Sequence, residues 1–71
     1  MTGSVYRVTE VIGTSSESWE AAAANAVATA AASVRDLRVA EVMRQDITIE
    51  NGAITSFRVR LGLSFKYEGG D

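Results

Sequence analysis

The chain has 71 residues, of which seven are basic and nine acidic, and it contains no cysteine, histidine or proline. Without cysteine and histidine it cannot form disulfides, a thiolate or imidazole zinc site, or a Ser-His-Asp triad, whereas carboxylate sites for calcium or magnesium remain open. The formal charge of −2 is too balanced for the basic footprint of a nucleic-acid binder, so we expect no nucleic-acid partner.

The first residues carry neither a basic region nor an apolar run. We therefore expect no signal peptide, no membrane partner and a cytoplasmic location. Residues 1–71 are too few for more than one domain, and a domain of this size buries little surface. We expect it to be stabilised by association with copies of itself.

Residues 5–12 are rich in β-branched and aromatic side chains and predict a strand that Gly13 ends. Both of its faces are partly apolar, which indicates that both are covered. Thr14 and Glu17 have the spacing of a capping box and predict the start of a helix. From there to about Leu37, roughly five turns, apolar residues recur at helical intervals: Trp19, Ala23, Ala26, Val27, Ala30, Val34 and Leu37.

Residues 39–50 predict a second strand that alternates only loosely, with a more polar side formed by Ala40, Val42, Arg44, Asp46, Thr48 and Glu50. Asn51-Gly52 is typical of a two-residue type I′ hairpin turn. The third strand, residues 53–67, alternates regularly, and one face is apolar: Phe57, Val59, Leu61, Leu63, Phe65 and Tyr67.

These elements predict an α+β fold of strand, helix, strand and strand. After a helical return the first two strands run the same way, so the antiparallel third strand lies between them, in the sheet order 1-3-2. One amphipathic helix covers one face of this sheet. The opposite face must meet solvent, a ligand or neighbouring subunits.

Seven charged residues on the strands could carry function: Glu10, Glu41, Arg44, Asp46, Glu50, Arg58 and Arg60. The commoner interpretation is cross-strand or inter-subunit ion pairing. The alternatives are anion recognition by the arginines and calcium or magnesium coordination by the acids. Trp19 is interpreted as a core residue, with stacking on a cofactor as the alternative. The amides of residues 13–15 could bind an anion, but an ordinary helix cap is the commoner use.

Three segments together resemble the dodecin family: Val11-Ile-Gly-Thr-Ser15, Ala40-Glu-Val42 and the strand from Phe57 to Phe65. The resemblance extends from Tyr6 to about Tyr67. It implies a hollow homododecamer that binds riboflavin or FMN as stacked pairs at twofold interfaces and catalyses no reaction. The pocket positions that it implies are Val39, Glu41, Arg44, Gln45 and Arg58.

Two of these positions depart from flavin-binding dodecins. A tryptophan that stacks on the flavin ring is Val39 in this chain, and a glutamine that hydrogen-bonds the ring is Arg58. Valine has no planar surface, and aromatic stacking contributes about 1 kcal/mol beyond area burial. The resemblance thus implies a flavin pocket that is weakened or lost.

Residues 18–20, 38–40 and 45–46 resemble a tryptophan-less branch of the family for which calcium is the proposed ligand. That branch would make Asp46, Glu50 and Glu10, and also Glu41, candidate oxygen donors. Two alternatives to an altered small-ligand pocket therefore stay open. One is a calcium dodecin, and the other is a structural shell without a dedicated ligand. An enzyme is not expected.

Overall fold

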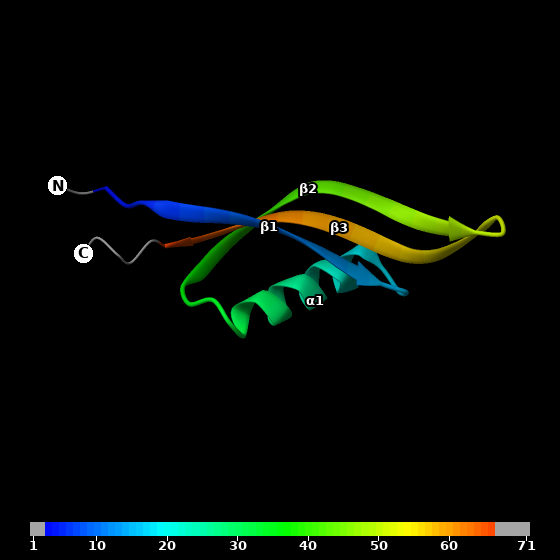
Figure 1. Ribbon diagram of the computed structural model, residues 1–71, viewed down its shortest axis with the longest axis horizontal. Coiled ribbons are helices and arrows are strands. Elements are labelled where there is room, and N and C mark those ends of the chain that lie inside the picture. Colours follow the sequence, from blue (N-terminus) through cyan, green and yellow to red (C-terminus); the bar gives the residue numbers. More distant parts are fainter. Residues whose placement is uncertain (1–2, 67–71) are drawn as a thin grey trace.

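The computed structural model describes residues 3–66, which form three strands and one helix. In chain order these are β1 (Tyr6–Ser15), α1 (Trp19–Ala31), β2 (Leu37–Glu50) and β3 (Ala53–Lys66). The strands form one antiparallel sheet in the order β1-β3-β2, and α1 lies against one face of it (Figure 1). The predicted α+β fold and strand order are confirmed.

The core lies between α1 and the central strand β3. Val59, Leu61 and Leu63 are at most 2% exposed, and as alternate residues of one strand they point to the same face. Ala22 and Ala26, one helical turn apart, are the buried residues of α1. Their small side chains let the helix backbone approach the sheet closely. Tyr67, which the sequence also predicts on this apolar face, lies outside the described residues.

The helix begins later than the sequence predicts, because β1 continues through Gly13 to Ser15, which pairs with Phe57. The N-cap is Ser18, whose Oγ accepts a hydrogen bond from the Ala21 N–H at 2.9 Å. The prediction of a Thr14-Glu17 capping box was therefore wrong. Ser15 instead accepts a hydrogen bond from the Glu17 N–H through its Oγ.

The helix also ends earlier than predicted, at Ala31. The N–H groups of Ser33 and Val34 still donate to the Ala30 carbonyl, but Asp36 has a positive φ of 59° that turns the chain back. Leu37 then pairs with Phe65 as the first residue of β2. Leu37 thus packs against the core from the sheet and not from the helix.

The turn between β2 and β3 follows the prediction. Asn51 and Gly52 have φ values of 53° and 79°, the positive pair that a type I′ turn requires. The two strands are long, and the hairpin they form extends past the N-terminal end of α1 (Figure 1). Its outer part therefore has no helix packed against it.

β2 does not alternate as predicted, because it contains a β-bulge. Val42 pairs with Leu61 and Arg44 with Arg60, so Met43 is an extra residue between two consecutive pairs. The bulge puts Val39 and Glu41 on the same face as Arg44, since partners on adjacent antiparallel strands share a face. The predicted grouping of Ala40 and Val42 with Arg44 was wrong.

Candidate functional site

The candidate site lies on the sheet face opposite α1, which we call the helix-free face. It is formed by alternate residues whose partners in β3 are Arg58, Arg60, Gly62 and Ser64. β1 contributes Val8, Glu10, Ile12 and Thr14, and β2 contributes Val39, Glu41, Arg44 and Asp46. The face therefore combines exposed apolar side chains with six charged side chains.

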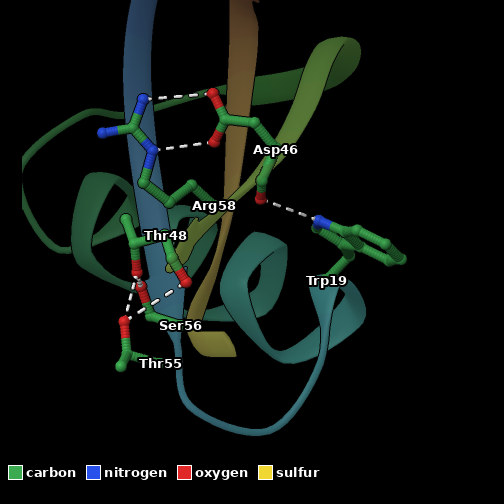
Figure 2. Close-up of polar contacts among 6 residues, drawn as sticks. All are labelled: Trp19, Asp46, Thr48, Thr55, Ser56 and Arg58. Carbon is green, nitrogen blue, oxygen red and sulfur yellow. Dashed lines mark hydrogen bonds and ion pairs between the residues drawn. The ribbon is translucent and has the colours of Figure 1, made fainter. Parts of the chain in front are cut away.

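Arg58 on β3 and Asp46 on β2 are directly opposite each other and form a bidentate ion pair. The Arg58 Nε donates to Asp46 Oδ1 at 2.7 Å and Nη2 donates to Oδ2 at 3.1 Å (Figure 2). These hydrogen bonds lower the pKa of the Asp46 carboxyl and raise the pKa of the Arg58 guanidinium from their ordinary values. The planar fork of arginine matches a carboxylate in this geometry.

Trp19 supports Asp46 from the helix side of the sheet. Its indole Nε1 donates to the Asp46 carbonyl oxygen at 3.1 Å (Figure 2). Its ring meets Phe57 edge to face, with centroids 5.2 Å apart, and it packs against the buried core. This placement supports the interpretation of Trp19 as a core residue.

A second ion pair lies beside the first. Arg60 Nη1 is 3.5 Å from Glu10 Oε1 across β1 and β3. Arg44, which is directly opposite Arg60, forms no ion pair within residues 3–66. The cross-strand ion pairing expected of this polar face is present for Arg58 and Arg60, whereas no ion pair within the described residues offsets the charge of Arg44.

The Asp46 carboxyl makes the folding stability of the chain depend on pH in the acid range. Its pKa is lower in the folded chain than in an unfolded one, so its contribution is complete above the unfolded carboxyl pKa of about 3.9 and is lost as pH falls through the folded value. We expect the melting temperature of the parent to fall as the pH drops below about 5, and the fall to be smaller in Asp46→Asn. Thermal unfolding monitored by circular dichroism checks this.

The control for that measurement is Glu50→Gln, since Glu50 has no ion pair within the described residues. It should follow the parent. An Asp46→Asn variant with the same acid profile as the parent would show that the Arg58 pair contributes nothing measurable to folding.

A sequence model of the dodecin family matches residues 5–68. The chain belongs to the dodecin family. The curated calcium dodecin of Mycobacterium tuberculosis is 49% identical over 63 residues, which cover 89% of each chain.

Solved dodecin structures agree with the fold described above. A dodecin from Streptomyces coelicolor matches with a TM-score of 0.90 at 38% identity, covering 99% of this chain and 100% of that one. A structure of the calcium dodecin of M. tuberculosis, a calcium-chelating antigen with a novel calcium-binding site, matches with a TM-score of 0.81 at 48% identity and covers 96% and 97% of the two chains. These similarities extend over nearly the whole dodecin chain.

The pocket positions implied for a dodecin are only partly brought together in one chain. Val39, Glu41, Arg44 and Arg58 share the helix-free face, whereas Gln45 pairs with Val59 and points toward the helix side. Val39 is 55% exposed and therefore available to a ligand or another subunit. Arg58 is engaged by Asp46.

The candidate calcium ligands of this dodecin do not converge. Asp46 and Glu10 are each paired with an arginine, and Glu50 is the last residue of β2. Within residues 3–66 no three acidic side chains are close enough to hold a metal ion. Because calcium takes six to eight oxygen ligands, one chain by itself does not fit the ion.

One feature of the structure was not predicted from the sequence. A groove of about 500 Å³ lies between α1 and β1, lined in part by Asn25, Thr29 and Ser33. The Asn25 side-chain amide donates to the Thr14 carbonyl at 3.0 Å. The available signal was the pair Asn25 and Thr29, polar residues four apart in an otherwise alanine-rich helix.

No helix in residues 3–66 has the length and apolar character needed to span a bilayer.

Proposed function

We propose that this dodecin family member is a non-enzymatic homododecamer that binds a small ligand on its helix-free face, and that the flavin site of the family is altered in it. One observation carries the second part. At the position where the resemblance implies a ring-binding glutamine, Arg58 stands with two of its nitrogens committed to Asp46. A flavin ring placed there would have to displace a charged pair and would find Val39 in place of a stacking indole.

Calcium is the second candidate ligand, and identity to the M. tuberculosis calcium dodecin favours it. Because no acidic cluster exists within the described residues of one chain, such a site requires oxygens from more than one copy. Glu41 and Glu50 are exposed and have no ion pair within residues 3–66. They are the acids that a neighbouring copy could meet without breaking an arginine pair.

The test is a pair of titrations on the dialysed oligomer, one with riboflavin followed by fluorescence quenching and one with calcium followed by calorimetry. We expect little quenching at equimolar riboflavin. If calcium is the ligand, it should release or absorb heat, and a chelator should lower the melting temperature.

Light scattering on the same sample determines the mass. A monomeric mass would contradict the proposed assembly, and near-stoichiometric flavin quenching would contradict the altered pocket. If neither ligand binds while the oligomer is intact, the shell without a dedicated ligand becomes the better interpretation of the family fold.

A further inference from the structure

Two arginines of the helix-free face are placed where their charges repel. Arg44 on β2 and Arg60 on β3 are direct partners in the antiparallel register, and like charges in that position destabilise a sheet. Glu10 offsets the charge of Arg60 at 3.5 Å. Arg44 has no such partner within residues 3–66, so the pair lacks one negative charge.

A small cavity lies at the same place. It measures about 50 Å³ and is lined by Ile12, Arg44, Asp46, Arg58 and Arg60. Three guanidinium groups and one carboxylate leave an excess of two positive charges around it, and Glu10 at Arg60 reduces that excess to one. Ligand pockets for drug-sized molecules begin at about 300 Å³, so this cavity suits only an ion or the terminal group of a larger molecule.

Arg58 is held in a defined orientation beside this cavity. Its Nε and Nη2 are bound to Asp46, and Figure 2 shows its remaining terminal nitrogen pointing away from that carboxylate. A guanidinium that is already oriented loses less conformational entropy when it binds a ligand. Since arginine donates to phosphate and carboxylate oxygens in fixed geometry, the remaining donors suit an oxyanion.

We propose that Arg44 and Arg60, with Arg58 beside them, form a binding site for a small tetrahedral oxyanion such as inorganic phosphate or the terminal group of a phosphate monoester. The anion would lie between the two opposed guanidinium groups and relieve their repulsion. The inference deepens the proposed function, because it rests on the helix-free face being the ligand face, and it names the chemical class that the altered pocket would accept.

The test uses the intact oligomer, inorganic phosphate as the probe and three variants measured at one protomer concentration. Phosphate should raise the melting temperature of the parent in a saturable way, beyond the effect of sodium chloride at equal ionic strength. Arg44→Gln should weaken phosphate binding by about tenfold or more, since it removes a charge-assisted donor. In phosphate-free buffer the same variant should melt no lower than the parent, because it also removes the repulsion.

Arg35→Gln is the matched control, because it removes the same charge from an exposed position before the start of β2, and it should keep the full phosphate response. The proposal is overturned if the parent does not respond to phosphate, if sodium chloride gives the same shift, or if Arg44→Gln responds as the parent does. The third variant, Glu41→Gln, tests whether the Glu41 carboxylate of a second copy fills the site instead. The proposal is overturned if Glu41→Gln responds to phosphate and the parent does not. Light scattering of each sample separates these outcomes from a failure of the proposed assembly.

Discussion

Gly13→Ala should destabilise the fold by about 3 kcal/mol or more, at the upper end of the range for overpacked cores. Gly13 lies in β1 where α1 crosses the strand, and a Cβ there would overlap the Ala22 carbonyl oxygen and lie 2.8 Å from the Ala26 Cβ. Both obstacles belong to the buried face of α1, so the helix itself would have to move. Chemical denaturation at fixed protomer concentration measures the change in unfolding free energy.

Gly62→Ala provides the matched control, because Gly62 also lies within a strand and is buried. Its added Cβ would meet the Met43 sulfur at 3.2 Å, and the flexible methionine side chain can move aside. We expect a loss of about 1 kcal/mol or less. Equal losses in the two variants would mean that close helix-to-strand contact at Gly13 is not what stabilises this corner.

The double variant Val39→Trp with Arg58→Gln should bind riboflavin at least about fivefold more tightly than the parent, because stacking contributes about 1 kcal/mol beyond area burial and each 1.4 kcal/mol is tenfold in affinity. Val39 is exposed on the helix-free face, so an indole fits there without displacing the core. Replacing Arg58 removes the charged pair with Asp46 and supplies the amide that the family resemblance implies. Quenching of riboflavin fluorescence reports the affinity.

Val42→Trp combined with Arg58→Gln is the control. Val42 is as exposed as Val39, at 55%, but it pairs with Leu61 and therefore faces the helix side of the sheet. An indole there should not improve flavin binding. Comparable tightening in both double variants would show that exposed aromatic surface, and not the position on the helix-free face, governs the affinity.

The order of the elements and their pairing could be read from local patterns. Asn51-Gly52 determined the hairpin, because both residues accept the positive φ that the turn needs. The alternation from Phe57 to Phe65 determined which face of β3 is buried, because the side-chain period of a strand is two. The family resemblance rested in part on the strand from Phe57 to Phe65, and the family model confirms that resemblance.

The ends of the helix depended on contacts that are distant in sequence. Gly13 to Ser15 continue β1 because they pair with residues 57–59 of β3, and this long-range pairing overrides a local capping pattern. At the other end, Leu37 leaves the helical stripe because it pairs with Phe65. A local periodicity carries no information about either partner.

The candidate site shows the same division. The sequence by itself determined which residue types are present: a valine in place of a stacking indole, an arginine in place of a glutamine, and a balanced set of strand charges. Only the tertiary structure decided which of them meet. The bulge at Met43 shifts the face of every residue after it, because one extra residue in a strand exchanges its two sides. That shift sets Arg44 against Arg60 and leaves Val39 and Glu41 on the same face.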